Sequence, residues 1–425
     1  MNRPPRRLWP LSKRVKLALA GLVVLAAGIA LAGYLYERNR TGNIYHPHAR
    51  FIPQPTPSLP KKGPDRFAWP LYGYTKNHTR FFPASAQVRP PFKKIWAHNS
   101  GTLLEFPPVI SGNHIYQLGD NGTLSALDKY TGKPFWIRPL GNLSASTPAV
   151  NSSTVYVTLM ASGPSGNGRI IALNAKTGQT RWHRDLPAPS ESSPLLDGNK
   201  IFFGSQGGTV YALNARNGNV LWTYHAGGAV KASPTLSGGV LYFGDYSGHL
   251  QAVSEQTGRA LWVSGSEGAL LGSGTFYSTP AVVYGRVFLG NTDGRVYAYD
   301  ASSGRLDWAV QTGAYVYSSP AVTNAPGLGP TVYIGSYDGN FYALNAQSGR
   351  IVWKFSAGGR ISGSPTIVGR NVYFADLGDH RTYGLGISTG RVTFQFPSGS
   401  FDPVISDGRA IFLTGSSGLY ELSPR

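Results

Sequence analysis

The chain has 425 residues and no cysteine, so it has no disulfide scaffold, no cysteine-ligated zinc site and no cysteine for lipid acylation. Charged residues are also scarce, at 14% of the total, which argues against coiled coils and helical solenoids. Glycine (54 residues), proline (31) and aromatic side chains (12%) are abundant instead. This composition indicates many short strands joined by tight turns. Because the length exceeds that of most single cores, we expect several domains or a modular closed array.

The formal net charge of +19 is concentrated in the N-terminal quarter of the chain. Residues 1–16 contribute +6 and residues 37–100 contribute +9, whereas the last 325 residues contribute only +4. The globular part therefore has no general excess of basic residues with which to bind nucleic acid. Nucleic acid is not among the predicted partners.

An uncharged apolar segment of 20 residues, 17–36, follows the basic N-terminus. A helix of that length spans the hydrocarbon core of a bilayer, which is roughly 30 Å thick. The positive-inside rule then predicts a cytoplasmic tail at 1–16, a single-pass transmembrane signal anchor at 17–36, and an extracytoplasmic remainder held at the cell membrane. A signal peptide cleaved after the small residues of Ala30-Leu31-Ala32 is the alternative, and it also exports the rest of the chain.

Residues 37–65 form a proline-rich linker. They show no apolar periodicity, and their prolines are Pro47, Pro53, Pro55, Pro57, Pro60 and Pro64. Such a segment favours an extended, solvated spacer. Arg38 and Arg40 lie next to the apolar segment, so contact with anionic headgroups or a cell-surface polymer is the alternative.

An internal repeat dominates the chain after residue 90. Its register mark is a proline that precedes an apolar stretch, usually after a small residue, and the marks recur at intervals of 38 to 46 residues: Pro108, Pro148, Pro194, Pro234, Pro280, Pro320, Pro365 and Pro403. An aromatic mark runs in parallel, at Trp96, Trp136, Trp182, Trp222, Trp262, Trp308, Trp353 and Phe394. We expect these aromatic side chains to pack between neighbouring repeats.

One repeat, Ser233–Gly265, contains four short alternating runs separated by glycine turns. Such runs are typical of antiparallel hairpins, and four strands every 40 or so residues form one propeller blade. The last repeat lacks a tryptophan strand, whereas Trp96 precedes the first proline mark. Both irregularities disappear if residues 93–98 supply the outer strand of the last blade. The sequence therefore predicts an all-β, eight-bladed propeller of four-stranded blades over 66–425, closed by an N-terminal outer strand.

The repeat resembles that of quinoprotein-like (PQQ-repeat) β-propellers, as in Ala232–Leu236 and Gly238–Trp262. Trp69, the run Tyr72-Gly73-Tyr74 and the run Thr79-Arg80-Phe81 resemble the lead-in before the first strand of those proteins. The family includes quinoprotein alcohol dehydrogenases, which bind pyrroloquinoline quinone and Ca²⁺, and non-catalytic scaffolds of outer-membrane assembly. The chain has neither the adjacent cysteines nor a matching quinone or Ca²⁺ motif, so the resemblance to the scaffolds is the better one. We expect no cofactor, no metal and no catalytic residue.

The mouth of the propeller axis is the predicted binding site. Residues three positions before the proline marks should ring one end of the central channel, and five of them are charged or aromatic: Glu105, Glu191, Lys231, Tyr277 and Tyr317. Lys231 is expected to pair with Glu191 in the neighbouring blade. The alternatives are that polar residues only solvate a water-filled channel, or that outer loops, beginning with Leu159–Gly168, form the binding surface.

These features predict a monomeric, exported, non-catalytic scaffold that binds a protein or peptide of the cell envelope. A quinone-dependent dehydrogenase and a module that binds cell-wall glycans are the alternatives from other functional classes.

Overall fold

The computed structural model describes residues 12–39, 43–46, 51–54, 67–85, 87–162, 167–266, 274–399, 401 and 404–425. The proline mark at 403 lies outside this range, as do residues 163–166 of the Leu159–Gly168 loop. The chain divides into an N-terminal unit that ends at residue 42 and a unit of β-sheets that begins at residue 43.

The N-terminal unit contains the helix α1 (Lys13–Asn39), so the predicted segment 17–36 is helical. Within the described residues, however, no helix combines the length and the apolar character needed to cross a bilayer. The transmembrane helix expected from the uncharged run is therefore not supported.

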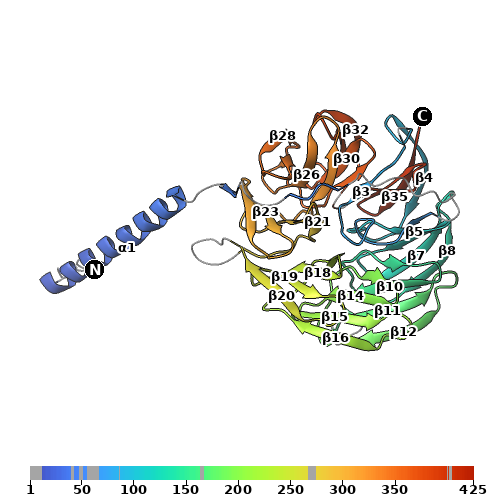
Figure 1. Cartoon of the computed structure of the whole chain (residues 1–425), viewed down its shortest axis with the longest axis horizontal. Helices are drawn as coiled ribbons and strands as arrows, with labels where there is room; N and C mark the ends of the chain where they lie inside the picture. Colours follow the sequence, from blue (N-terminus) through green and yellow to red (C-terminus); the bar gives the residue numbers. More distant parts are fainter. Residues whose placement is uncertain are drawn as a thin grey trace, which may run out of the picture. The chain divides into compact units, whose positions relative to one another are not determined.

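The second unit is an eight-bladed β-propeller, as predicted (Figure 1). The first four blades follow one another from the blue-green to the yellow part of the ring. Blade 1 contains β5 (Val109–Ser111), β6 (His114–Leu118), β7 (Thr123–Asp128) and β8 (Pro134–Pro139). Blade 2 contains β9 (Ala149–Val150), β10 (Thr154–Leu159), β11 (Arg169–Asn174) and β12 (Thr180–Asp185). Blade 3 contains β13 (Leu195–Asp197), β14 (Lys200–Gly204), β15 (Thr209–Asn214) and β16 (Val220–His225). Blade 4 contains β17 (Thr235–Ser237), β18 (Val240–Gly244), β19 (His249–Ser254) and β20 (Ala260–Gly265).

The other four blades complete the ring. Blade 5 contains β21 (Ala281–Val283), β22 (Arg286–Gly290), β23 (Arg295–Asp300) and β24 (Leu306–Gln311). Blade 6 contains β25 (Ala321–Ala325), β26 (Gly329–Gly335), β27 (Asn340–Asn345) and β28 (Ile351–Ser356). Blade 7 contains β29 (Thr366–Val368), β30 (Asn371–Asp376), β31 (Arg381–Gly386) and β32 (Val392–Phe396). Blade 8 contains β33 (Val404–Ser406), β34 (Ile411–Gly415), β35 (Gly418–Pro424) and β4 (Phe92–Asn99).

Blade 8 confirms the predicted closure. Its outer strand β4 pairs antiparallel with β35, and Trp96 lies opposite Glu421. Strands from the two ends of the propeller sequence thus share one sheet, which leaves no blade incomplete. Lys129, Asp407, Arg409 and Glu421 form a charged cluster between blades 1 and 8, next to this seam.

The repeated tryptophans pack between blades, as predicted, and each indole N–H donates a hydrogen bond to a carbonyl of the next blade. Trp96 donates to Lys129 and Trp136 donates to Ala175. The same bond recurs at Trp182, Trp222, Trp262, Trp308 and Trp353. From Trp136 onward, the glycine four residues before each aromatic mark packs against the indole ring of the preceding mark. Gly178, for example, has φ +68°, and a Cβ there would lie 2.7 Å from Trp136.

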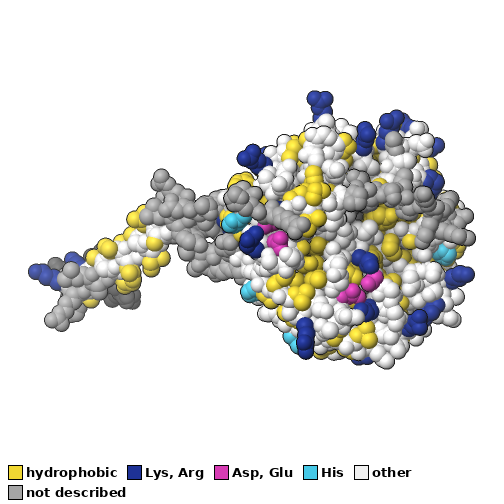
Figure 2. Space-filling view, viewed as in Figure 1, with side chains coloured by type: hydrophobic (Ala, Val, Ile, Leu, Met, Phe, Trp, Pro, Cys, Tyr) yellow, Lys and Arg dark blue, Asp and Glu magenta, His cyan; other side chains and the backbone are white. Residues whose placement is uncertain are grey.

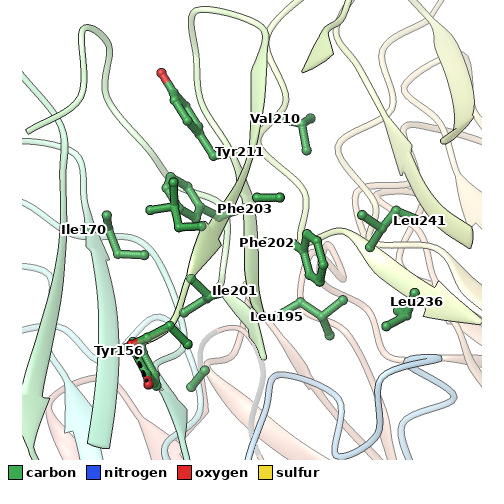
Figure 3. Close-up of a cluster of buried hydrophobic side chains, with 14 of the residues drawn as sticks. Tyr156, Ile170, Leu195, Ile201, Phe202, Phe203, Val210, Tyr211, Leu236 and Leu241 are labelled. Atoms are coloured by element: carbon green, nitrogen blue, oxygen red, sulfur yellow. Dashed lines mark hydrogen bonds between the residues drawn. The ribbon is translucent and has the colours of Figure 1, made fainter. Parts of the chain in front are cut away.

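Apolar side chains from facing sheets fill the space between blades. In the cluster drawn in Figure 3, Ile170 of blade 2 and Ile201 and Phe202 of blade 3 are fully buried. In the second and third strands of each blade, central side chains on both faces of the sheet are apolar, because both faces pack on neighbouring blades. This rigid packing positions the residues at the axis.

The segment from Phe67 to Phe82 crosses one end of the central channel. It contributes β2 (Ala68–Trp69), which pairs with β5, and β3 (Phe81–Phe82), which runs parallel to β29. Between these strands, backbone carbonyls accept hydrogen bonds from the innermost strands or their entries in blades 2, 4, 5 and 6: those of Pro70, Lys76, Asn77 and Thr79. Lys76 also pairs with Asp197 of blade 3 at 2.7 Å. We call this segment the plug.

A short part of the predicted linker lies on blade 5. β1 (Ile44–Tyr45) adds to the outer edge of β24, and the Phe51 ring stacks on Tyr284 at 5.1 Å. Together they cover a buried ion pair between Arg286 and Asp307 (2.6 Å), and Phe51 lies 5.0 Å from the Arg286 guanidinium. The sequence predicts a solvated spacer here because it lacks apolar periodicity. Two isolated contact points suffice for docking on a ready-made sheet edge.

Figure 2 shows one face of the protein, viewed as in Figure 1. Lys and Arg side chains are spread mainly along the periphery of the propeller and alternate with uncharged surface. The described part of this face therefore lacks a broad basic patch.

Candidate functional site

The structure brings all five predicted site residues to a single pocket on the propeller axis. Its volume is about 60 Å³, and its lining contains Glu105, Glu191, Lys231, Tyr277 and Tyr317. Each precedes the innermost strand of its blade by the same offset, so the ring of blades turns equal sequence positions into neighbours. Ser362, at the same offset in blade 7, also lines the pocket, whereas Ser400 of blade 8 lies outside the described residues. We call this pocket the mouth.

An ion pair occupies one side of the mouth. Lys231 Nζ lies 2.8 Å from Glu191 Oε1, and the two side chains are 22% and 10% exposed. This is the pair between blades 3 and 4 that the sequence predicts. Glu191 also accepts a hydrogen bond from the amide of Gln206, and the Lys231 ammonium lies 5.0 Å from the centre of the Tyr246 ring.

A chain of tyrosines continues from this ion pair along the mouth. The ring centres of Tyr246 and Tyr277 are 6.3 Å apart, and those of Tyr277 and Tyr317 are 5.6 Å apart. Tyr317 then contacts Tyr337 at 4.9 Å and Tyr315 at 6.0 Å. Tyr315 is 54% exposed, so the chain of rings reaches from inside the mouth to solvent. We call these residues the tyrosine arc.

The plug supplies the floor of the mouth. Tyr72 lines the pocket, and its hydroxyl lies 3.0 Å from Ser364 Oγ. The Arg80 guanidinium lies 4.4 Å from the Tyr72 ring centre and donates hydrogen bonds to the carbonyls of Ser364 and Pro365. The mouth is therefore a pocket that the plug closes at its base.

Hydroxyl groups form the wall below the rim. The backbone N–H of Ser233 donates to Thr279 Oγ1, that of Thr279 to Ser319 Oγ, and that of Ser319 to Ser364 Oγ. These residues immediately precede the proline marks. The small residue before each of these prolines thus forms a hydrogen bond to the next blade, and these bonds fix the spacing of the rim residues above them.

Burial and the nearby carboxylates determine the protonation of the mouth. Burial raises the pKa of Tyr277 well above its usual value, and Glu191 and Glu105 add to this effect. Burial also raises the pKa values of Tyr246 and Tyr317. The tyrosines therefore keep their protons at neutral pH. Nearby, burial raises the pKa of Asp120 to about 6, although a hydrogen bond from the backbone of Glu105 opposes this shift.

The sequence did not predict that Tyr72, Tyr246, Tyr315 and Tyr337 belong to the site. Tyr246 and Tyr337 occupy matching positions in the turns between the second and third strands of blades 4 and 6, where blade 3 has Gln206. This offset was available as a signal, because those turns open on the same end of the ring as the rim residues. Tyr72 belongs to the plug, which has no repeat and so gives no positional signal.

The residues of the mouth do not fit pyrroloquinoline quinone and Ca²⁺. The quinone is a planar tricarboxylic acid, whereas the mouth has two carboxylates and a lysine that Glu191 already pairs. A volume of about 60 Å³ admits a few water-sized groups rather than a tricyclic ring system. Among the described residues, no group of three His, Asp or Glu side chains is placed to hold a metal ion.

Comparison with solved structures shows the same fold at low sequence identity. BamB from Moraxella catarrhalis aligns with a TM-score of 0.63 and 17% identity, over 78% of this chain and 99% of that one. A europium-containing methanol dehydrogenase aligns with a TM-score of 0.68 and 16% identity, over 84% and 91%. The quinohemoprotein alcohol dehydrogenase from Comamonas testosteroni gives 0.68 and 14%, over 84% and 80%.

No curated protein matches the sequence. A family model does, and its overlapping matches cover residues 93–193, 121–270, 166–315 and 318–425. These matches span all eight blades, including the closing strand. The chain therefore belongs to the PQQ-repeat family described as outer membrane protein assembly factor BamB.

Proposed function

We propose that this protein is a non-catalytic scaffold that binds a protein or peptide of the cell envelope through the mouth of its propeller. One observation carries the proposal: the five rim residues that depart most from a uniform repeat converge on one pocket, together with a tyrosine arc. Aromatic side chains concentrated on a rigid ring are typical of recognition surfaces.

Stability gives little reason for the ion pair at the rim. Lys231 and Glu191 are largely buried, and replacing such an ion pair by well-packed apolar side chains of similar volume is often neutral or stabilising. Burial raises the pKa values of Tyr246, Tyr277 and Tyr317, so these side chains offer hydroxyl donors and ring faces instead of a nucleophile or base. These properties suit binding better than catalysis.

We also propose that the propeller lies outside the cytoplasm. The order of six basic residues followed by an uncharged apolar segment supports export, as does membership of a family described by outer-membrane assembly. Fusion of a reporter enzyme to the C-terminus tests it: activity of a reporter that works only outside the cytoplasm is expected, and activity of a cytoplasm-only reporter would contradict export.

Site-specific photocrosslinking in cells tests the binding site. A photoreactive residue in place of Tyr315, at the exposed end of the arc, is expected to capture a defined partner, whereas one in place of Phe135, equally exposed on an outer strand, is not. When the photoreactive residue is at position 315, an added Lys231→Ala or Tyr317→Ala should reduce capture. Because Lys231→Ala leaves the largely buried Glu191 without its cation, capture is compared at a temperature well below the melting temperature of each variant. Lys354→Ala, which removes an exposed lysine from β28, is the matched control and should leave capture unchanged.

Three outcomes would redirect the assignment. Capture that both mouth variants leave unchanged would move the binding surface to the outer loops, beginning with Leu159–Gly168. Oxidation of alcohols or sugars with a dye acceptor after addition of the quinone and Ca²⁺ would replace the scaffold with a dehydrogenase. Retention on purified wall polymer, lost in Tyr317→Ala, would identify a glycan-binding module instead.

A further inference from the structure

We infer that the mouth binds the positively charged tip of a lysine or arginine side chain in an extended segment of the partner protein. The inference rests on the proposed function, because it names the chemistry by which the mouth recognises that partner.

The tilt of the tyrosine rings favours a cation over a flat ligand. The planes of Tyr277 and Tyr317 are inclined by 86°, and those of Tyr315 and Tyr317 by 82°. Rings inclined in this way form a cage, because they present different edges and faces to the same space. A sugar ring or a planar heterocycle would instead stack on a coplanar platform. Cages of this kind recognise ammonium and guanidinium groups, because the face of each ring carries negative charge density.

The protein's own cations already contact both ends of the arc. The Lys231 ammonium lies 5.0 Å from the centre of the Tyr246 ring, and the Arg360 guanidinium lies 5.8 Å from that of Tyr337. Between these ends, Tyr277 and Tyr317 contact other tyrosine rings and line the pocket. The middle of the arc thus offers the same surface to an incoming cation.

The charges around the mouth also favour a cation. The charged side chains that line it are Glu105, Glu191 and Lys231, and Lys231 is already paired with Glu191. Both carboxylates act on Tyr277, as the rise in its pKa shows. Arg80 lies against the Tyr72 ring but does not line the pocket, and its guanidinium donates to two backbone carbonyls. An incoming ammonium on Tyr277 therefore lies beside two carboxylates, whereas Lys231 and Arg360 contact the two ends of the arc.

The size of the mouth selects the tip of a side chain. A volume of about 60 Å³ accommodates a few groups of the size of water, such as an ammonium or guanidinium with its last methylenes. The partner backbone must then remain above the rim, where the exposed ring of Tyr315 is available to it. An extended segment with one projecting basic residue satisfies both conditions.

Fluorescence anisotropy with labelled peptides tests the inference. The probe is a seven-residue Gly/Ser peptide with blocked ends and one central lysine, and the matched peptide carries acetyl-lysine, which keeps the length but removes the charge. The full-length chain should bind the lysine peptide and not the acetylated one. Glu105→Gln and Tyr317→Leu should each weaken binding about tenfold, the scale of one lost charge or ring contact. Tyr317→Phe, which keeps the ring, and the control Lys354→Ala should bind as the unmodified protein does.

Equal binding of the two peptides, full binding by Tyr317→Leu, or no binding of the lysine peptide would each overturn the inference. The photocrosslinking experiment separates this failure from that of the proposed function. Partner capture that depends on Lys231 and Tyr317, without a preference for lysine peptides, would leave the scaffold standing and remove only the cation. Capture independent of the mouth would remove both.

Discussion

The charged cluster at the ring closure gives a quantitative test of how the propeller is held shut. Lys129 of blade 1 and Asp407 of blade 8 form an ion pair of 3.1 Å, and their side chains are 0% and 1% exposed. The other carboxylate oxygen of Asp407 accepts the backbone N–H groups of Arg409 and Ala410. Replacing Lys129 with Met leaves this carboxylate buried without its nearest cation.

Removal of one member of a buried ion pair costs about 3–5 kcal/mol. Asp407 keeps its two backbone donors and the Arg409 side chain at 3.7 Å, so we expect the lower end of that range, about 3 kcal/mol. Asp407→Asn should cost a similar amount, because it leaves the Lys129 ammonium buried. In the double variant, however, neither charge remains, while the new amide oxygen at position 407 still accepts the turn N–H groups. It should lie within about 1 kcal/mol of the unmodified protein.

Thermal unfolding followed by circular dichroism measures these differences. Each single variant should lower the melting temperature by about 3–6 °C, and the double variant should recover most of that loss. Lys354→Met, at an exposed position on β28, is the control and should shift it by less than about 1 °C. Single variants that melt like the unmodified protein would show that the pair does not hold the seam. A double variant as unstable as the sum of the two would show that the residues act independently.

Three further predictions concern the rest of the propeller. The pKa of Asp120 is raised to about 6 in the folded state from an unfolded value near 4. The folded state therefore loses stability as pH rises through this window. Asp120→Asn should raise the melting temperature at pH 7 and leave it nearly unchanged at pH 4. Trp353→Phe removes one hydrogen bond to the Ile387 carbonyl, which still accepts from the Tyr333 hydroxyl, so the change should cost about 0.5–1.5 kcal/mol in chemical denaturation, more than an exposed-site change. Phe51→Ala uncovers the Arg286–Asp307 pair, and it should make residues 43–54 more susceptible to limited proteolysis while the propeller remains resistant; unchanged digestion would show that the Phe51 ring does not hold this segment.

The parts of this fold that repeat were predictable from the sequence. The proline and tryptophan marks fixed the number of blades, and the orphan Trp96 fixed the closure, because a ring must end where it begins. The same periodicity brought Glu105 and Tyr317 to one pocket, although they are far apart in the chain. Residues at the same offset from a repeat mark lie at the same height along the propeller axis, whatever their side chains are.

The parts that occur once were not predictable. The plug has no second copy against which to align it, and several of its hydrogen bonds to the blades pass through its backbone carbonyls, which are the same for any sequence. Tyr72 therefore gave no indication that it forms the floor of the mouth. Similarly, β1 has two residues and pairs with β24 through its backbone. Neither amphipathic pattern nor composition marks such a short addition to a sheet edge.

Departures from the repeat locate the specialised surfaces of this propeller, and two of the three have a structural cause. At the seam, Lys129 replaces the alanine found at Ala175 and Ala215, and its partner Asp407 accounts for it. On blade 5, Asp307 breaks the pattern of the outer strands, and Arg286 and the docked segment account for it. At the mouth, the rim and turn positions change from blade to blade between acid, base and tyrosine, yet the ring of Ser and Thr hydroxyls below them already ties the blades together. The hydroxyl ring links the blades without the rim residues, which supports our proposal that the rim chemistry serves a binding partner.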